Sequence, residues 1–386
     1  MFKDLFKRKA KKSKTLARME AGVDLPFVVI TALLVGCGLI IFSSATLMLI
    51  GTVKYDAVRF NQYGLGFIGG LILLYGAYKI PLVYWRKLSF YMYIGAVLLM
   101  IGVFIPGLGV FHGGAHRWVR FAGFQFQPAE IYKISAVLYM SMWFVRDFGK
   151  KITTKENFHR RTIPLLVVMG ITAILLLLQP DTDTFLVTIV SLVTIYIVAG
   201  GHMKDVFLLG LIGVLGLGVI IMSRPYVLKR FQTFMNPSLD PTGSGYQVQQ
   251  SLIAIGTGGV FGRGYGQSIQ KFKYLPEPIG DSIFAVASEE FGFTGVFLLI
   301  SLYIAFALRS LRLATKSSSY GSLVIVGLTS LIVIQSFLNM AAMLGLIPLS
   351  GTPLIFVSHG GTALLMSLFA IGIMLSASRE RKVGVQ

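Results

Sequence analysis

The sequence contains a single cysteine, Cys37, among its 386 residues. An intramolecular disulfide is therefore excluded, and no cluster of cysteine and histidine indicates a metal centre. Acidic residues are also few, since 16 Asp and Glu accompany 35 Lys and Arg. The P-loop motif and the nucleophile elbow of a serine hydrolase are both missing, so the sequence offers no evidence for either kind of site.

In contrast, apolar residues make up 55% of the sequence and charged residues only 13%. An apolar run of about 20 residues is long enough to cross a hydrocarbon core of about 30 Å as a helix. Such runs predict an all-α polytopic membrane protein, a bundle of about ten transmembrane helices. The predicted spans are residues 25–50, 63–83, 88–105, 128–144, 162–179, 183–200, 205–222, 281–307, 321–346 and 353–377.

The positive charges are distributed unevenly over this predicted topology. Most Lys and Arg lie in the two tails and in the loops on the same side of the membrane, as the positive-inside rule expects for cytoplasmic segments. With an even number of spans, both termini are then cytoplasmic. We interpret the net charge of +19 as a signal for topology and for anionic lipid, and we expect no nucleic-acid partner.

The chain divides into two tails and one membrane domain. We place a basic cytoplasmic tail at residues 1–24, the ten-helix membrane domain at 25–377 and a cytoplasmic C-terminal tail at 378–386. A long extracytoplasmic loop, residues 223–280, separates the seventh span from the eighth. Loops of that length are uncommon without structure of their own and are often functional. Within it, the mixture of polar and apolar positions at 246–255 predicts a short helix.

A group of carboxylates gathers at or just inside the predicted outer boundary. Its members are Glu130, Asp181, Asp183, Glu277, Asp281, Glu289 and Glu290. A carboxylate at that depth is costly unless it faces a watery cavity or a cation. Asp281 begins a span, so its position fits a helix cap and a catalytic group equally well. Asp181 and Asp183 are expected to cap the span that follows them.

Basic residues offer structural partners for several of these carboxylates. Glu130 and Lys133 lie three residues apart on one predicted helix, which favours a salt link between them. A buried pairing with Lys133 or Arg263 would account for Glu289 or Glu290.

Two segments on the predicted outer side are rich in glycine. Residues 106–127 hold glycines that favour tight turns, together with Arg117 and Arg120, which suit a diphosphate because arginine binds phosphate bidentately. Residues 256–266 have backbone amides for cradling phosphate oxygens, but the P-loop lysine is missing, so the pattern does not identify a nucleotide site.

A long series of short motifs occurs in one order along the chain. They are Arg117-Trp118, Gln127-Pro128-Ala129-Glu130, Gln179-Pro180-Asp181, Gly245-Tyr246-Gln247, Gln250-Ser251-Leu252-Ile253-Ala254, Gly262-Arg263-Gly264, Tyr274-Leu275-Pro276-Glu277, Asp281, Asn339-Met340 and Ser358-His359-Gly360-Gly361. In these motifs the sequence resembles the bacterial shape, elongation, division and sporulation (SEDS) family. The segment from Ser268-Ile269-Gln270-Lys271 to Pro276-Glu277-Pro278 is more similar to the FtsW branch of that family than to the RodA branch.

The sequence departs from the family pattern at three places. Gly280-Asp281-Ser282 stands where Thr-Asp-Phe is usual, Ala129 where serine is usual, and Asp183 where glycine is typical. The central aspartate is kept, so these departures concern the shape of the pocket around it.

The resemblance implies a peptidoglycan glycosyltransferase that polymerises lipid II by inverting hexosyl transfer, for cell division or cell shape. It implies a multi-pass location in the bacterial cytoplasmic membrane, with the reaction at the outer face. Asp281 is then the general base that takes a proton from the acceptor hydroxyl. The residues implied in substrate binding are Arg117, Glu130, Lys133, Gln250, Arg263 and Glu277.

The leaving undecaprenyl diphosphate needs positive charge in the transition state. Arg117, Lys133 and Arg263 are the candidates, with Glu130 orienting Lys133; a divalent cation, Mg²⁺ or Mn²⁺, remains open, and no other cofactor and no protein metal site is expected. The implied partners are lipid II, the lipid-linked glycan, a class B penicillin-binding protein that acts as transpeptidase, and other proteins of the division or elongation machinery.

Two other classes of function stay open at this point. A lipid II flippase would use buried Glu and Lys residues as a polar path, although the internal repeat common among transporters is missing. A noncatalytic division scaffold would use the basic tails to recruit partners. Loss of function on changing Asp281 alone would separate catalysis from scaffolding.

Overall fold

The computed structural model describes residues 22–112, 115–121, 124–150, 152–223 and 225–380. The basic residues of the predicted N-terminal tail from Lys3 to Arg18, and Arg381 and Lys382 of the predicted C-terminal tail, lie outside the described residues.

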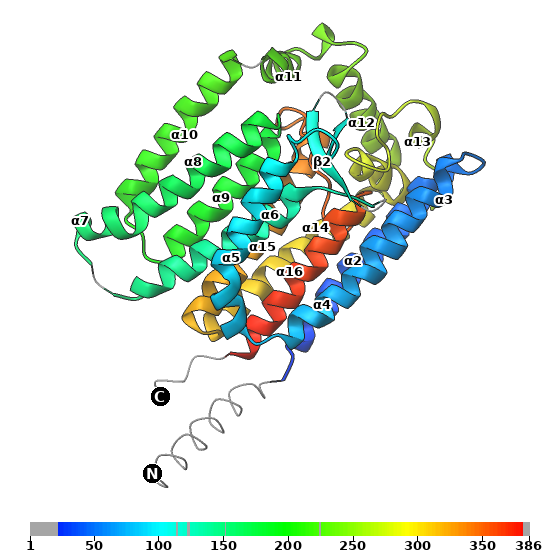
Figure 1. The fold of residues 1–386 in the computed structure, drawn as a ribbon. Helices are drawn as coiled ribbons and strands as arrows, with labels where there is room; N and C mark the ends of the chain where they lie inside the picture. Colours follow the sequence, from blue (N-terminus) through cyan, green and yellow to red (C-terminus); the bar gives the residue numbers. More distant parts are fainter. Residues whose placement is uncertain (1–21, 113–114, 122–123, 151, 224, 381–386) are drawn as a thin grey trace, which may run out of the picture.

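Ten helices of the described chain form one bundle at the positions where the sequence predicts spans (Figure 1). Their bounds are α2 Leu25–Ala45, α4 Gly70–Lys79, α5 Leu82–Gly102, α6 Pro128–Phe144, α8 Ile163–Leu178, α9 Thr182–Val198, α10 Met203–Ser223, α14 Ile283–Lys316, α15 Ser319–Met343 and α16 Gly361–Arg379. The predicted helical bundle is thereby confirmed.

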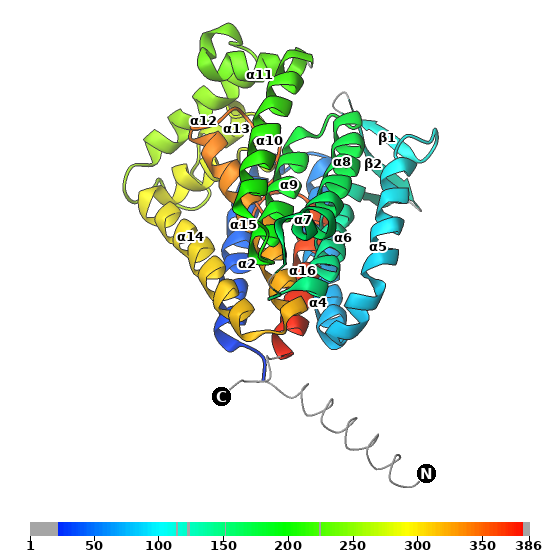
Figure 2. The ribbon, with the colours of Figure 1, turned by 90° about the vertical axis from the view of Figure 1, so that its left-hand side faces the viewer.

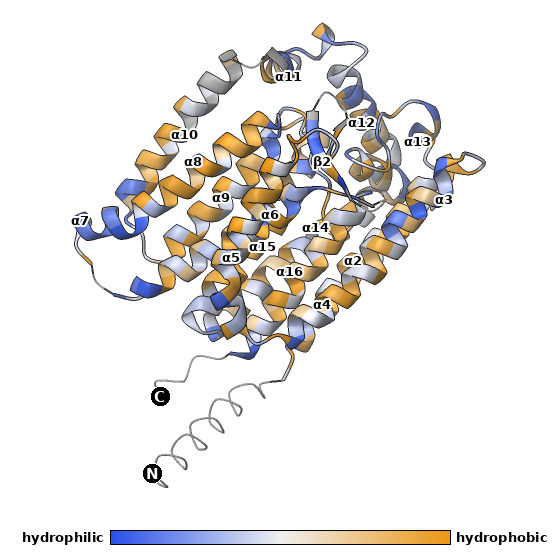
Figure 3. Cartoon of the chain, viewed as in Figure 1, coloured by the Kyte–Doolittle hydropathy of each residue, from blue (hydrophilic) through white to orange (hydrophobic). Residues whose placement is uncertain are grey.

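The sides of this bundle are mostly apolar and its ends more polar (Figure 3). Apolar side chains are exposed along the sides, among them Ile72 at 67% and Phe207 at 78%, as expected for a surface solvated by lipid. By length and composition alone, five described helices can cross a membrane, or six if the bent pair Lys54–Lys79 and Leu82–Gly102 counts as one span. Helices α6 and α9 have 17 residues each and pack within the same bundle. The chain is a multi-pass membrane protein.

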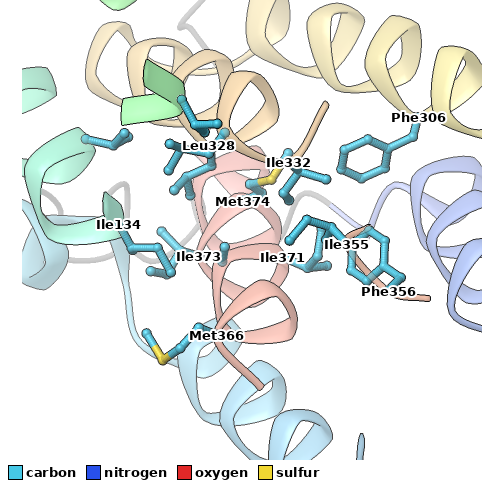
Figure 4. Close-up of a cluster of buried hydrophobic side chains, with 14 of the residues drawn as sticks. Ile134, Phe306, Leu328, Ile332, Ile355, Phe356, Met366, Ile371, Ile373 and Met374 are labelled. Atoms are coloured by element: carbon cyan, nitrogen blue, oxygen red, sulfur yellow. The ribbon is translucent and has the colours of Figure 1, made fainter. Parts of the chain in front are cut away.

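The core is built around α16, which packs against α4 and α15. Figure 4 shows Ile371, Ile373 and Met374 of α16 among apolar side chains from α6, α14 and α15. Ile355 and Phe356, from the segment that precedes α16, join the same cluster. This packing holds residues 353–360 inside the protein, where they can support neighbouring loops.

The first described helix begins, and the last ends, at the same end of the bundle (Figure 1). Arg309 near the end of α14 donates to both carboxylate oxygens of Asp24, which caps α2, at 2.8 and 2.6 Å. The amide of Ser318 donates to the carbonyl of Glu380 at 2.7 Å. The two described ends therefore lie together, as an even number of spans requires.

The opposite end carries a small sheet and several short helices (Figure 2). They are α3 Lys54–Arg59, α11 Pro225–Met235, α12 Ser244–Gly258, α13 Gln270–Lys273 and strands β1 Gly109–His112, β2 Ala115–Phe121 and β3 Phe124–Phe126, while α7 Thr154–Asn157 lies at the other end. The sheet is antiparallel in the order β1-β2-β3. It was not predicted, because the glycines of residues 106–127 indicate turns without showing which strands pair; α12 confirms the helix predicted at 246–255.

Several predicted span boundaries are wrong. The helix of the second span ends at Lys79, not at 83, and the third span begins at Leu82, not at 88, because Pro81 separates α4 from α5. The last span begins at Gly361, not at 353, because residues 353–360 form an irregular segment against the loop before α14. Helix α14 continues to Lys316, beyond the predicted end at 307. The second helical span starts earlier, because α3 runs through a π-helical stretch, Phe60–Gly69, into α4.

Candidate active site

Asp281 lies in a tight turn immediately before α14. The amides of Gly280 and Ser282 donate to the carbonyl of Glu277 at 3.0 and 3.1 Å, and Glu277 itself has a φ of 47°. Ser282 occupies the N-cap position of α14, and no side-chain cap bond is made there. Asp281 is therefore not the cap of this helix, and the structural explanation that the sequence left open for it is wrong.

Neighbouring elements hold this turn through its backbone. Asn339 of α15 donates from Nδ2 to the carbonyl of Asp281 at 2.8 Å. Ser358 donates from Oγ to the carbonyl of Gly280 at 2.8 Å. The amide of His359 donates to the carbonyl of Ile279 at 2.7 Å. These bonds involve the main chain of the turn, so they position the Asp281 carboxylate without occupying it.

A second acid and a cation meet Asp281 at Gly351. Arg230 of α11 donates from Nη1 to Oδ2 of Asp183 at 3.2 Å, and the amide of Gly351 donates to the same oxygen at 2.9 Å. A Cβ built on Gly351 would lie 3.7 Å from Nη2 of Arg230, from Oδ2 of Asp183 and from Oδ2 of Asp281. The three charged groups therefore surround one point.

The surroundings raise the pKa of Asp281 to about 7. Burial is the main cause, the negative charges of Glu277 and Asp183 act in the same direction, and Arg230 and Arg117 oppose them. A carboxylate whose pKa lies near neutral pH can accept a proton and release it again under physiological conditions.

Arg117 is placed beside this group by the sheet. It lies on β2 and donates to the carbonyls of Gln179, at 3.2 Å, and of Pro180 in the turn before α9. In that turn Asp181 accepts from the amide of Thr184 at 3.2 Å and is the N-cap of α9. The cap predicted for Asp181 is thus confirmed.

The cap predicted for Asp183 is wrong, because this residue lies inside α9 and binds Arg230 and the Gly351 amide instead. Sequence reasoning missed both Asp183 and Arg230 as site residues. Two signals for Asp183 were available: it belongs to the carboxylates at the predicted outer boundary, and it stands where the SEDS family typically has glycine.

Lys133 and Glu130 form the salt link that their spacing predicts. Lys133 is 4% exposed and donates to Glu130 at 2.9 Å and to Oε1 of Gln335 at 2.7 Å. The three side chains line a small cavity together with Met366. Gln335 lies one turn before Asn339 on α15, so this buried cluster connects to the Asp281 turn through that helix.

Arg263 and the two glutamates of α14 lie apart from this group. Arg263 pairs with Glu289 at 3.4 Å, which is one of the pairings that the sequence left open, whereas Glu290 pairs with the buried Lys271 at 2.6 Å and with neither Lys133 nor Arg263. Glu289 follows Asp281 by eight residues, roughly 12 Å along a helix.

The glycine-rich segment packs against α14. The amides of Gly262, Arg263 and Gly264 donate to the carbonyls of Gly258, Glu289 and Glu290 at 2.9 Å each. These amides are engaged by backbone carbonyls, so the phosphate cradle considered for residues 256–266 is not formed by them.

Glu277 belongs to the Asp281 turn, and Gln250 belongs to α12, which is bonded to that turn. Gln250 is half-buried on α12. Three residues before it, Gln247 donates from its side-chain Nε2 to Oγ of Ser282 at 2.9 Å. Glu277 is exposed at the start of the turn. Over the residues that the structure describes, no group of three or more His, Cys, Asp or Glu is arranged to hold a metal ion.

An apolar helical bundle whose end holds a carboxylate under the electrostatic influence of two guanidinium groups is typical of multi-pass membrane proteins with a polar site near the end of the bundle. Residues 25–383 match the family of cell cycle proteins named for FtsW, RodA and SpoVE. The chain belongs to this family.

Relatives of known name resemble the chain over almost its full length. Stage V sporulation protein E of Bacillus subtilis (strain 168) is 37% identical over 92% of this chain and 97% of that protein. The "Probable peptidoglycan glycosyltransferase FtsW" of Geobacter sp. (strain M18) is 32% identical over 95% of this chain and 99% of that protein.

The same fold occurs in a solved structure of a peptidoglycan synthase complex that coordinates polymerisation and crosslinking. One chain of that complex superposes with a TM-score of 0.76, over 94% of this chain and 100% of its own length, at 22% identity. At that identity the likeness concerns the fold.

Proposed function

We propose that this chain is a peptidoglycan glycosyltransferase that polymerises lipid II at the outer face of the bacterial cytoplasmic membrane. The observation that carries the proposal is the Asp281 carboxylate, which is held through its backbone and has a pKa of about 7. The name of the FtsW relative, a peptidoglycan glycosyltransferase, supports the same activity.

The reaction joins an acceptor sugar to the end of a lipid-linked glycan. The acceptor hydroxyl attacks the anomeric carbon of the donor, the bond from that carbon to the undecaprenyl diphosphate breaks, and the configuration inverts. Asp281 takes the hydroxyl proton as the new bond forms and later returns it to water. The bonding electrons of the broken bond leave with the diphosphate.

The leaving diphosphate requires positive charge near Asp281. Arg117 is the cation we assign, because it acts on Asp281 electrostatically and is held on β2. Lys133 is buried with Glu130 and Gln335, so it supports the site from inside the bundle, with Glu130 orienting it. Arg263 pairs with Glu289 and contacts the glycan or lipid at a greater distance from the base.

Glu277 is assigned to the sugar chains because it is exposed in the turn that holds Asp281. Gln250 is assigned to them because it lies on α12, whose Gln247 bonds Ser282 at that turn. A divalent cation would arrive with the diphosphate of the substrate, because the described residues provide no three-ligand cluster for it. Chelation by EDTA followed by addition of Mg²⁺ or Mn²⁺ tests this requirement.

In this proposal the end with the sheet and α11 to α13 faces outward, and both tails are cytoplasmic. The partner is a class B penicillin-binding protein, which crosslinks the strands that this chain polymerises. The solved synthase complex of the same fold supports such an assembly. Other proteins of the division or elongation machinery are expected to bind the same complex.

A lipid II flippase is the second candidate, favoured by the buried Glu130–Lys133–Gln335 cluster inside the bundle. One experiment separates the two. Purified protein, alone and co-expressed with its penicillin-binding protein, receives labelled lipid II in detergent, where no membrane has to be crossed. Glycan product supports the transferase, whereas lipid II movement across vesicles without any polymer supports the flippase.

A further inference from the structure

We propose that Asp183 and Arg230 form a positioning pair for Asp281. By binding the Arg230 guanidinium, Asp183 keeps it from pairing with the Asp281 carboxylate, which stays available to take the acceptor proton. This inference rests on the proposed function, in which Asp281 is the base.

The geometry places the two acids in competition for one cation. Nη2 of Arg230 and the Oδ2 atoms of Asp183 and Asp281 each lie 3.7 Å from the position of a Cβ on Gly351. Arg230 is bound on the Asp183 side, at 3.2 Å from Nη1. The side chains of Arg230 and Asp183 are 29% and 26% exposed, so neither is locked in a core.

Asp183 is anchored where it stands. It lies in the first turn of α9, and the Gly351 amide donates to the same oxygen that accepts from Arg230. Arg230, in contrast, belongs to α11, a helix outside the bundle (Figure 2). Asp183 is therefore the fixed side of this ion pair, within the bundle, and Arg230 is the side that belongs to the outer helix.

The consequence for catalysis follows from the chemistry of an Arg–carboxylate pair. Such a pair favours the charged carboxylate, often by one to three pKa units, and occupies its oxygens with N–H donors. A base engaged in this way accepts a proton less readily. Pairing Arg230 with Asp183 preserves the basicity that burial confers on Asp281.

Four charged groups face Asp281 from the elements around it. Glu277 belongs to its own turn, Asp183 to α9, Arg230 to α11 and Arg117 to β2. Since Glu277 and Arg117 remain unchanged in the variants below, any change in pH dependence reports on the pair.

The test is the pH profile of lipid II polymerisation by the complex with its penicillin-binding protein. The variants are Asp183→Asn, Arg230→Gln and both together. In Asp183→Asn, we expect the acid limb to move down by about one pH unit and the plateau kcat to fall about tenfold, because Arg230 turns to Asp281. In Arg230→Gln the acid limb moves to higher pH, because a cation is lost.

The double variant gives the decisive result. If Asp183 acts by restraining Arg230, adding Arg230→Gln to Asp183→Asn restores most of the lost kcat. The inference is wrong if the two variants lower kcat additively and the acid limb does not move, because the pair would then be merely structural. It is also wrong if Arg230→Gln raises KM and the double variant keeps that raised KM, because the pair would then bind substrate.

Two controls complete the design. Lys229→Gln removes a neighbouring cation of α11 that is 64% exposed and paired with Asp240, and it should leave the profile unchanged. Asp281→Asn is measured in parallel. If it retains full activity, the proposed base is wrong and the inference falls with it; if it is inactive while Asp183→Asn behaves as wild type, only the inference fails.

Discussion

At the scale of single residues, the chemistry depends on one carboxylate in unusual surroundings. Asp281 is half-buried, it does not cap α14, and its turn is bonded to Asn339, Ser358 and His359 through the backbone. Groups whose pKa is shifted by burial and by a specific charge are concentrated at functional sites. The surroundings of Asp281 therefore suit a base that works near neutral pH.

This predicts the direction of the pH dependence. The raised pKa of Asp281, about 7, means that the carboxylate needed for catalysis accumulates as the pH rises through that value. Polymerisation, measured as kcat/KM, should therefore fall about tenfold for each pH unit below the pKa. A rate that stays constant across that range, with the protein still folded, would contradict the assignment.

Some residue-level contacts follow from local sequence and others do not. The Glu130–Lys133 link is predicted because i and i+3 side chains are neighbours on any helix. The Asp183–Arg230 pair joins residues 47 positions apart, and Gln335 reaches Lys133 across 202 positions. The periodicity of the sequence cannot predict such pairs, since they depend on how helices pack.

At the scale of elements, hydropathy predicts the spanning helices but not their ends. Residues 353–360 are apolar enough to be assigned to a span, yet Ser358 and the amide of His359 bond the turn before α14. The segment is irregular because it donates hydrogen bonds to that turn. The hydropathy of the sequence does not predict these bonds. The sheet within residues 109–126 was not predicted, because its described strands are short and hydropathy does not show that they pair with one another.

Where α14 meets the glycine-rich segment, the position of Gly292 should not accommodate a side chain. Gly292 has a φ of 64° inside α14, and a Cβ there would lie 2.2 Å from the amide nitrogen of Gly262. We expect Gly292→Ala to destabilise the protein by at least about 1–2 kcal/mol, because a left-handed backbone and a clash add together.

Thermal unfolding in detergent measures this effect. Gly210→Ala is the matched control, because a Cβ on Gly210 meets nothing within 4 Å, and it should leave the midpoint unchanged or slightly higher. Equal midpoints for Gly292→Ala and wild type would show that the close backbone approach is not needed.

At the scale of the whole molecule, the two ends of the bundle differ in structure. One end joins Asp24 to Arg309 and Ser318 to Glu380. The other carries the sheet and α11 to α13 (Figure 2), and Asp281 lies in the turn between α13 and α14. The excess of basic residues in the predicted inner loops predicts that the end with Asp24 and Glu380 is cytoplasmic, because translocation disfavours positive charge.

This orientation predicts which positions a membrane-impermeant thiol reagent can reach. In a Cys37→Ser background, Asp56→Cys on α3 should react in intact cells, whereas Lys316→Cys at the end of α14 should react only after permeabilisation. Both positions are exposed, so accessibility depends on the side of the membrane. Labelling of Lys316→Cys alone in intact cells would reverse the proposed topology.

The most direct test of the central claim is polymerisation of labelled lipid II by the purified complex with its penicillin-binding protein, comparing wild type with Asp281→Asn at equal folded yield. Asp56→Asn, an exposed acid of the same end, is the control. The account predicts glycan strands from wild type and from Asp56→Asn, and a loss of at least about a hundredfold in Asp281→Asn. Equal product from wild type and Asp281→Asn would remove Asp281 from the mechanism.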